Sequence, residues 1–331
     1  MAVTSLGVPV GDTALEAYLR ERLEEVESGL AAAVSSSSPF VAEAARHLLE
    51  AGGKRFRPLL VLLAAQFGDP DAAGVLPAAL VVELTHVATL YHDDVMDEAQ
   101  LRRGAPSAND RFGNTVAILT GDFLFARASD IVADLGPEAV HVQARTFARL
   151  VQGQIWETAG PPADQDPLEH YLGVVADKTG SLIAASAHLG ALTAGCDTRT
   201  QLTLTSFGER IGAAFQLSDD ILDVVGDEAS SGKTPGTDLR EGVATLPVLL
   251  VRRAAGSGDE RLLELLAGGL ADDVRHGEAL SLLRAHPAMD EARAYVLERA
   301  ADARGLLIGL PEGSARDALG DLCDLAVTRS A

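Results

Sequence analysis

The sequence predicts an all-α protein, built as a single domain of ten or more helices. Long stretches rich in Ala, Leu, Val, Glu and Arg lie between a few clusters of the 14 prolines, and this composition favours helix. Apolar residues recur at spacings of three and four, which is the period of one helix face. We find no convincing run with the two-residue period of a strand and no short internal repeat.

The expected helices follow one another between loops marked by Gly, Pro and Ser. Residues 1–11 are expected to form a loose arm, and 12–331 the domain. Helices are expected from near Thr13 to the SSSSP run, over VAEAARHLLEAGG, over PLLVLLAAQFG, from Pro77 to Asp97, from Asn114 to Leu135, from Pro137 to Glu157, over 168–195, over 198–225, and in three or four segments from Leu246 on. RRGAPSA (102–108) and GDEASSGKTPGTD (226–238) are expected to be loops, the second one flexible.

Composition and charge exclude several classes of function. The net charge of −21 argues against nucleic acid as a partner, because phosphate backbones require a basic face. No signal-like segment opens the chain, and no run of about 18 uncharged apolar residues predicts a transmembrane helix. Cys196 and Cys323 match no metal or redox spacing, so a cytoplasmic protein is expected.

The first group of candidate site residues is HDDVMD, with Asp93, Asp94 and Asp97. On a helix, Asp93 and Asp97 share a face because they are four residues apart. Carboxylates gathered at one helix end repel one another unless cations lie between them, and such hard oxygen ligands suit Mg²⁺. A solvated acidic helix end is the ordinary alternative. The motif follows the apolar stretch VVELTHVATLY, which favours a metal site instead.

A second motif, FQLSDDILD, repeats the same spacing with Asp219, Asp220 and Asp223. It also follows a helix with apolar periodicity, FGERIGAAFQL. One such motif is unremarkable among 48 acidic residues, but two at the ends of apolar helices are not expected by chance. The pair therefore predicts two walls of one metal-lined pocket.

Basic residues in two short segments are candidates for binding phosphate. GGKRFRP places Lys54, Arg55 and Arg57 beside two glycines and before a helix, an arrangement that suits a diphosphate. LRRGAP places Arg102 and Arg103 soon after the first acidic motif. The ordinary alternatives are a basic surface loop for the first segment and salt bridges to the acids for the second.

Lysine is rare in this chain: of 27 basic residues, only Lys54, Lys178 and Lys233 are lysines. Against such a bias towards arginine, a lysine indicates a place where a compact ammonium is needed instead of a planar fork.

Four segments occur in a fixed order: GGKRFRP, LYHDDVMDEAQLRRGAPSAN, DKTGSL and FQLSDDILDVVGDEASSGKTPGTDLREG. Together they closely resemble the trans-isoprenyl diphosphate synthases, and within them the long-chain bacterial polyprenyl synthases. The resemblance covers about residues 40–250. It implies a helical bundle around a central cavity, condensation of isopentenyl diphosphate with an allylic diphosphate, about three Mg²⁺ ions per active site, and a homodimer.

The resemblance also implies a role for each matching position. The metal ligands would be Asp93, Asp97 and Asp219, with Asp94, Asp220 and Asp223 completing the catalytic acids. The allylic diphosphate would be held by the metals, Arg102, Lys178 and Lys233. Isopentenyl diphosphate would be held by Lys54, Arg57, His86 and Arg103. Thr179 and Gln216 would lie near the reacting carbons.

Two of these positions need comment. A histidine on an apolar helix is ordinarily a core residue, but His86 lies two turns before Asp93 and so faces the metal side. The loop that carries Lys233 is expected to close over the phosphates as a lid. Many relatives read EGKxTLP where this chain reads EGVATLP, with Val243, so one phosphate or lid contact is missing or is supplied by another group.

In the implied reaction, the C1–O bond of the allylic diphosphate breaks to give an allylic cation. The double bond of isopentenyl diphosphate attacks this cation, and a proton leaves, to the departed diphosphate rather than to a protein base. Cations stabilise the leaving group, and water must be kept out.

Two other classes share parts of this pattern. A class I terpene cyclase has the same fold and first acidic motif, but its second motif mixes Asn/Asp, Ser/Thr and Glu, whereas this chain has DDILD. A silent partner subunit loses aspartates, and both motifs are intact here.

The product tail is expected to run along the helix that ends at the first motif. One helical turn rises about 5.4 Å, close to one extended isoprene unit. Short-chain relatives place bulky aromatics one turn before the acids. The residues of this chain at successive levels are small: Ala88, Thr89, Thr85 and Val82. We therefore expect an all-trans product of about C30 to C50 from farnesyl or geranylgeranyl diphosphate, which can be delivered to a membrane. A shorter geranylgeranyl or farnesyl product, with Phe123 or Phe125 as the floor, is the alternative.

Overall fold

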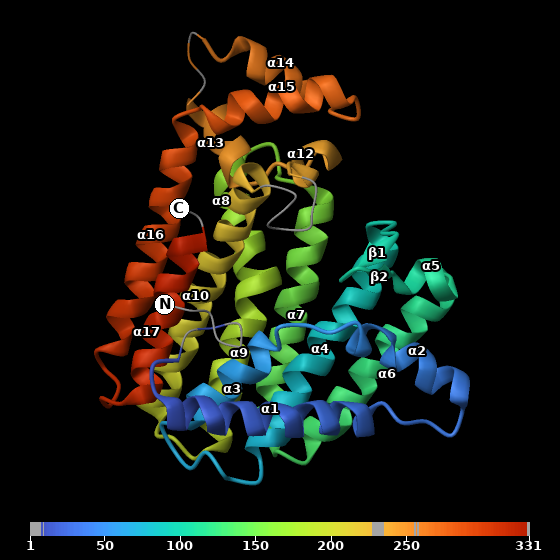
Figure 1. The fold of residues 1–331 in the computed structure, drawn as a ribbon, viewed down its shortest axis with the longest axis vertical. Helices are drawn as coiled ribbons and strands as arrows, with labels where there is room; N and C mark the ends of the chain where they lie inside the picture. The colour runs from blue at the N-terminus through green and yellow to red at the C-terminus, as the bar shows by residue number, and fades with distance from the viewer. Residues whose placement is uncertain (1–7, 9, 227–234, 255, 257, 330–331) are drawn as a thin grey trace. The chain divides into compact units, whose positions relative to one another are not determined.

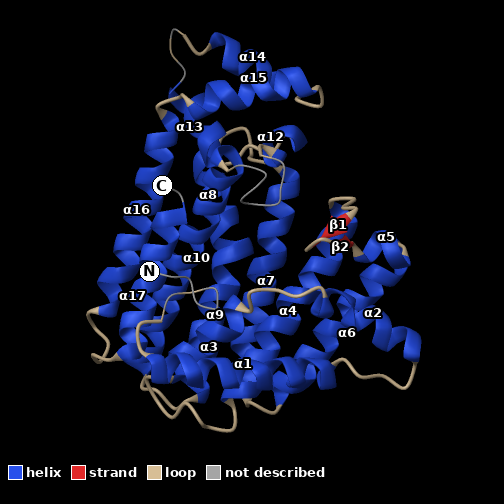
Figure 2. Cartoon of the chain, viewed as in Figure 1, coloured by secondary structure: helices blue, strands red, loops and turns tan. Residues whose placement is uncertain are grey.

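The computed structural model describes residues 8, 10–226, 235–254, 256 and 258–329. Its α-helices are α1 (Thr13–Ala33), α2 (Pro39–Glu50), α3 (Phe56–Ala65), α4 (Val75–Met96), α5 (Ala108–Phe112), α6 (Asn114–Ala133), α7 (Pro137–Ala159), α8 (Pro167–Val174), α9 (Ser181–Thr193), α10 (Thr198–Val225), α12 (Thr237–Glu241), α13 (Leu246–Ala254), α14 (Glu260–Ala267), α15 (Asp273–Arg284), α16 (Ala288–Leu307) and α17 (Ser314–Arg329) (Figure 1). Helices account for almost all of the regular structure in this part of the chain (Figure 2). The predicted all-α fold is confirmed.

Two local features differ from the sequence prediction. The segment expected to be a loop at 102–108 contains a short antiparallel hairpin, β1 (Leu101–Arg102) and β2 (Ala105–Pro106). Strands of two residues show no alternation, so no pattern reveals them. The helix expected over 168–195 is interrupted by a π-helical turn, η1 (Val175–Gly180), between α8 and α9. Such turns are rare and have no signature in apolar spacing.

The described residues divide into two compact units, which we describe separately. Unit 1 comprises Met1–Ala148, Leu182–Gly208 and Leu306–Asp321, and unit 2 comprises Arg149–Ser181, Glu209–Gly305 and Leu322–Ala331. The single domain over 12–331 remains a prediction. Most of the predicted arm (1–7 and 9) lies outside the described residues, and the side chains of Val8 and Val10 are buried.

Helix α4 lies at the centre of unit 1. It packs most extensively against α6, and also against α3 and α1. A side chain at Gly121 of α6 would collide with the ring of His92 and would lie 3.1 Å from the carbonyl oxygen of Ala88. Glycine at this position therefore allows α4 and α6 to approach closely.

Among the described residues, α4 is also the helix that is long and apolar enough to cross a membrane. Its apolar window is 61% buried within the protein, and it carries Glu83, His86 and the first acidic motif. This packing accounts for the apolar composition, so we interpret α4 as a core helix.

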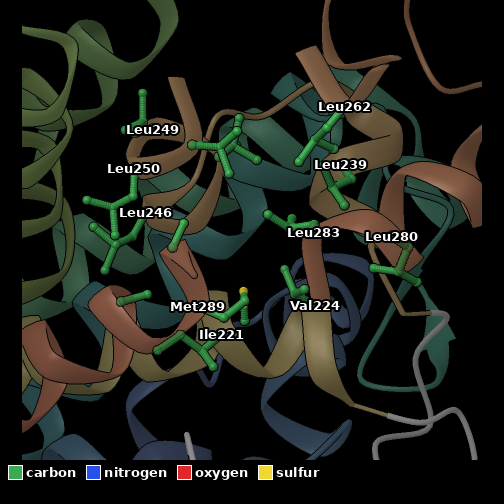
Figure 3. Close-up of a cluster of buried hydrophobic side chains, with 14 of the residues drawn as sticks. Ile221, Val224, Leu239, Leu246, Leu249, Leu250, Leu262, Leu280, Leu283 and Met289 are labelled. Atoms are coloured by element: carbon green, nitrogen blue, oxygen red, sulfur yellow. The ribbon is translucent and has the colours of Figure 1, made fainter. Parts of the chain in front are cut away.

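The core of unit 2 holds the second acidic motif in place. Apolar side chains at spacings of three and four on α10 (Leu217, Ile221 and Val224) enter a cluster with leucines of α12, α13, α14 and α15 (Figure 3). Asp220 lies between two of these core positions and is itself buried. The apolar stripe of α10 therefore fixes the orientation of the neighbouring aspartates.

Candidate active site

The three acids of the first motif lie in different environments. Asp94 is fully buried, while Asp93 is half-buried and Asp97, at the end of α4, is exposed. One oxygen of Asp94 accepts a hydrogen bond from Arg102 Nε at 2.6 Å, and the other accepts one from the Ala108 backbone at 3.2 Å. Asp94 thus anchors the hairpin and the start of α5 to α4, and the salt bridge considered for Arg102 is present.

The hairpin and the GGKRFRP loop interlock within unit 1. Arg103 Nη1 donates hydrogen bonds to the carbonyl oxygens of Leu48, at 3.2 Å, and Gly52. A Cβ atom on Gly53 would lie 2.9 Å from the same nitrogen, so a side chain there would displace the guanidinium from this position. Arg103 itself has a left-handed backbone (φ 55°), as the tight turn requires.

Arg55 is turned towards two acids and not towards a phosphate site. Its guanidinium pairs with Glu27 of α1 and with Glu83 of α4, the latter at 2.9 Å, and donates to the Leu49 carbonyl at 2.8 Å. Both Arg55 and Glu83 are buried. The sequence grouped Arg55 with its basic neighbours Lys54 and Arg57, because spacing in a loop does not show which side chain turns inward.

Arg57 and His86 form the half-buried part of the basic site. Arg57 Nε is buried and has no hydrogen-bond partner among the described residues. Burial lowers the pKa of Arg57 to about 10, against the opposing effect of Glu83. Burial, and then Arg57 and Arg103, hold the pKa of His86 well below its usual range. At neutral pH the histidine is therefore uncharged, and the guanidinium of Arg57, whose Nε is buried, can bind an anion. Lys54, the remaining predicted residue, is exposed.

The acids of the second motif, in unit 2, also include one buried residue and one exposed residue. Asp220 is buried and accepts hydrogen bonds from the Tyr171 hydroxyl and from Gln216 Nε2, the latter at 3.1 Å. Burial, and then Asp238, raise the pKa of Asp220 well above its usual range. Asp219 is 52% exposed and pairs with Arg329 Nη2 at 2.7 Å. Asp220 thus organises the site while Asp219 remains at its surface.

Asp223 binds the end of the loop predicted at 226–238, where the structure already begins α12 (Thr237–Glu241). Its two carboxylate oxygens accept hydrogen bonds from the backbone nitrogens of Thr237, at 3.1 Å, and Asp238, at 3.2 Å. These nitrogens belong to the first turn of α12. Lys233, the predicted lid residue, lies outside the described residues.

The π-helical turn presents two predicted residues. Thr179 Oγ1 donates to Gln216 Oε1 at 3.1 Å, which joins Thr179 to the Gln216–Asp220 pair, and the Lys178 ammonium pairs with Glu157. The structure therefore brings Thr179, Gln216 and Asp220 together. Tyr171 completes this chain of hydrogen bonds, and sequence reasoning missed it because a lone tyrosine on an amphipathic helix carries no signal.

The chain-length positions lie on α4 in unit 1. Ala88, Thr85 and Val82 are buried, and Thr89 is half-buried. Thr85 Oγ1 donates to the Val81 carbonyl and accepts a hydrogen bond from Gln143 Nε2 of α7 at 2.6 Å. Phe125, the alternative floor, packs against Phe147 with ring centres 4.3 Å apart.

The carboxylates of the two motifs suit a hard cation whose remaining ligands are water and phosphate oxygens. Within the described ranges, no three His, Cys, Asp or Glu side chains converge as a closed metal site. Asp94 and Asp220 are buried, and Asp93, Asp97 and Asp219 lie at half-buried or exposed positions. Mg²⁺ is commonly bound by one or two carboxylates with water and phosphate oxygens. Because the two motifs belong to different units, their meeting in one pocket remains a prediction.

This all-helical fold, with its two aspartate motifs and its half-buried basic site, defines the class of helical prenyltransferases. The family model described as Polyprenyl synthetase matches residues 38–282, and the chain belongs to this family. It is 48% identical to the nonaprenyl diphosphate synthase of Mycobacterium tuberculosis over 99% of this chain and 98% of that protein. The chain is therefore a prenyltransferase of the polyprenyl diphosphate synthase type.

Solved structures give the same result. The crystal structure of geranylgeranyl pyrophosphate synthase from Corynebacterium glutamicum, complexed with calcium and isoprenyl diphosphate, has a TM-score of 0.88 and 43% identity over 98% of this chain and 99% of that one. A decaprenyl diphosphate synthase from Rhodobacter capsulatus has a TM-score of 0.88 and 32% identity over 96% and 99% of the two chains. These relatives make products of different lengths by name, so family membership does not fix the product of this chain.

Proposed function

We propose that this protein adds isopentenyl diphosphate head-to-tail to farnesyl or geranylgeranyl diphosphate and makes an all-trans product of about C30 to C50. One observation carries the length: the predicted chain-length positions of α4 below Asp93 are small, with Thr89 one turn down, Thr85 two turns down and Val82 three turns down. The 48% identity to a nonaprenyl diphosphate synthase also supports a long product.

Isopentenyl diphosphate is bound, in this proposal, by Arg57, His86, Arg103 and Lys54. The unpaired Nε of Arg57 supplies a buried donor for a phosphate oxygen. Neutral His86 donates a hydrogen bond without adding another charge to a site that already holds several arginines. Arg103, held by the Leu48 and Gly52 carbonyls, keeps its orientation during binding.

The allylic diphosphate is held by Arg102, Lys178, Lys233 and the acids that bind metal. We assign about three Mg²⁺ ions to Asp93, Asp97 and Asp219, and these ions would neutralise the leaving diphosphate. Lys178 would exchange its pair with Glu157 for the diphosphate. Thr179 and Gln216, already joined at 3.1 Å, would present fixed dipoles to the developing allylic cation.

A shorter product is the second candidate. It is favoured by the 43% identity to a geranylgeranyl pyrophosphate synthase and by the Gln143–Thr85 contact beside the predicted path of the tail. The experiment below distinguishes the two lengths.

The test uses purified protein with Mg²⁺, labelled isopentenyl diphosphate and farnesyl diphosphate, with products separated by chain length. We expect labelled prenyl diphosphates of about C30 to C50, and none when the metal is chelated. Products ending at C20 would establish the shorter-chain function. A cyclase would instead release hydrocarbon without label, and a silent subunit would release nothing.

We also propose a homodimer in the cytoplasm whose product is delivered to a membrane. Ile118 and Leu119 on α6 are apolar and exposed in unit 1, and a second copy could cover them. The two buried cysteines are not disulfide-bonded, which is compatible with a reducing compartment. Light scattering should give twice the chain mass for the wild type and the chain mass for Leu119→Glu. A monomeric wild type would refute the dimer.

A further inference from the structure

Tyr171 of α8 donates a hydrogen bond from its hydroxyl to Oδ2 of Asp220, the buried acid of the second motif. The backbone nitrogen of Leu246 also approaches this oxygen, but only to 3.5 Å, which is a weak contact. The ring of Tyr171 packs against the apolar core of unit 2. The phenol is therefore the principal partner of this oxygen and is itself held in place by packing.

The other oxygen of Asp220 orients the amide of Gln216. Gln216 lies one turn earlier on α10, and its Nε2 donates to Asp220 Oδ1 at 3.1 Å. Since an amide has one donor end and one acceptor end, Oε1 must then turn the other way, where it accepts a hydrogen bond from the Thr179 hydroxyl at 3.1 Å. The bond to Asp220 thus determines which end of the amide faces Thr179.

The direction of these bonds determines what Thr179 can offer to a ligand. A hydroxyl has one hydrogen and two lone pairs. Because its hydrogen is donated to Gln216, Thr179 Oγ1 can only accept, and it presents negative charge density. An electron-deficient carbon suits such an oxygen, whereas a phosphate oxygen would be repelled by it.

The backbone beside Thr179 is held by packing that does not involve Tyr171. On the side of α7, a Cβ atom on Gly153 would lie 2.7 Å from the backbone nitrogen of Lys178, so the helix and the π-helical turn are in close contact. Removing the Tyr171 hydroxyl should therefore leave the turn in place and free the amide of Gln216 to rotate.

We propose that Tyr171 is a positioning residue for the reaction: through the two side chains that follow it in this series of bonds, it fixes the Thr179 hydroxyl as an acceptor towards the allylic cation. The inference rests on the proposed function and deepens it, because it names the residue that orients the groups beside the reacting carbons. Tyr171 acts on the transition state, where the positive charge develops, and not on the binding of the diphosphates.

The experiment is a double-mutant cycle on the first condensation, so its result does not depend on product length. The proteins are wild type, Tyr171→Phe, Thr179→Val and the double variant. Phenylalanine keeps the ring and valine keeps the branched shape, so each substitution removes one hydroxyl. Tyr18→Phe is the matched control, since the Tyr18 hydroxyl donates to the Pro70 carbonyl at 3.0 Å in unit 1. The readouts are kcat, KM for both diphosphates, and folding by circular dichroism.

We expect Tyr171→Phe to lower kcat about five- to fiftyfold and to change neither KM by more than about twofold, because the lost orientation matters only in the transition state. In the Thr179→Val background the same substitution should lower kcat by less than about twofold, since no hydroxyl is left to orient. Tyr18→Phe should match the wild type.

Three results would refute the positioning role and leave the proposed function standing: equal fractional losses of kcat in the two backgrounds, a wild-type kcat in Tyr171→Phe, or a Tyr171→Phe protein that does not fold. A wild type that condenses no primer would refute the proposed function, and the role of Tyr171 with it.

Discussion

Arg329 and Asp219 form an ion pair at the second acidic motif, with Nη2 and Oδ1 2.7 Å apart. Arg329 lies near the end of α17, and its guanidinium also lies 5.8 Å from the ring centre of Phe215 on α10. Asp219 is the acid predicted to bind metal at this motif. The carboxylate of Asp219 is therefore paired with an arginine, and Mg²⁺ would compete with this arginine for it.

Arg329→Ala should lower the Mg²⁺ concentration that gives half-maximal turnover by about two- to fivefold, because a half-exposed ion pair of this kind is worth up to about 1 kcal/mol. The measurement is the initial rate of condensation as a function of Mg²⁺ concentration. Arg304→Ala is the matched control, since Arg304 pairs with Asp324 at 2.5 Å at another exposed position. Equal Mg²⁺ dependence in both variants and the wild type would show that Arg329 does not compete with the metal.

Asp93→Ala and Asp219→Ala should each lower turnover by several orders of magnitude while the fold survives. Each substitution removes a predicted metal ligand and also relieves repulsion among neighbouring acids, so the stability of Asp93→Ala without metal should hold or rise. Asp219→Ala also loses the pair with Arg329, so its stability should change by no more than about 1 kcal/mol. Turnover is read by product formation and folding by circular dichroism. Asp290→Ala, which changes an exposed aspartate on α16, should be normal. Near-normal turnover in either site variant would contradict the metal assignment.

Glu83→Gln should destabilise the protein by about 3 kcal/mol, because it removes the buried counter-charge of Arg55. Glu27→Gln is the internal comparison, since Glu27 pairs with the same arginine but is 50% exposed. It should cost about 1 kcal/mol or less. Urea unfolding at neutral pH measures both. Equal losses of unfolding free energy in the two variants would show that the buried Glu83 contributes no more to stability than the half-exposed Glu27.

His86→Gln should make the stability less sensitive to acid. Because the pKa of His86 is held well below its usual 6.5, the folded chain binds fewer protons there than the unfolded chain. The stability that this group contributes is fully present above pH 6.5 and is lost as the pH falls towards the lowered pKa. The wild type should lose up to about 1.4 kcal/mol per pH unit more than the variant in that window.

Urea unfolding at pH 7.5 and pH 5.5 tests this prediction, with the exposed His141 replaced by glutamine as the control. A gap between wild type and His86→Gln that does not change with pH would contradict it.

Thr89→Phe should end the product at about C15 to C20 with the first condensation intact, because a ring one turn below Asp93 would block the tail. The effect of Ala88→Phe on product length would be combined with an effect on packing, since Ala88 is fully buried and its carbonyl faces Gly121 of α6. Overpacking at such a position typically costs about 1–3 kcal/mol. Product lengths and thermal unfolding together distinguish the two effects. An unchanged product from Thr89→Phe would show that this face of α4 does not line the tail.

The sequence was sufficient to predict the helical fold and the family. Long apolar periods predicted the helices that bear the two acidic motifs, and α4 and α10 end where those motifs indicate. Spacing alone also placed Asp93 and Asp97 on one face. These features are local, since they depend on residues within a few turns of one another.

Contacts between segments that are far apart in the chain could not be predicted from the sequence. Nothing in HDDVMD distinguishes Asp94 as the buried anchor of Arg102, because that role depends on where the hairpin returns. Likewise, Arg55 and its two acids come from three separate segments. Tyr171 and Gln143 each carry a hydrogen bond to a site residue, but neither belongs to a pattern of spacing that periodicity can detect.

The π-helical turn at Val175–Gly180 has a consequence for how this chain tolerates insertions and deletions. A π turn holds one residue more than an α turn, so deleting a residue there would let α8 continue into α9 as ordinary helix. Because the wide turn takes up the extra residue, the helices on either side would keep their phase, but the side chains within the turn would have to take new positions. Thr179 would then leave Gln216, although every side chain of the motif was still present. The extra residue therefore determines where the side chains of this one turn lie, and length at this point of the chain is as constrained as residue identity.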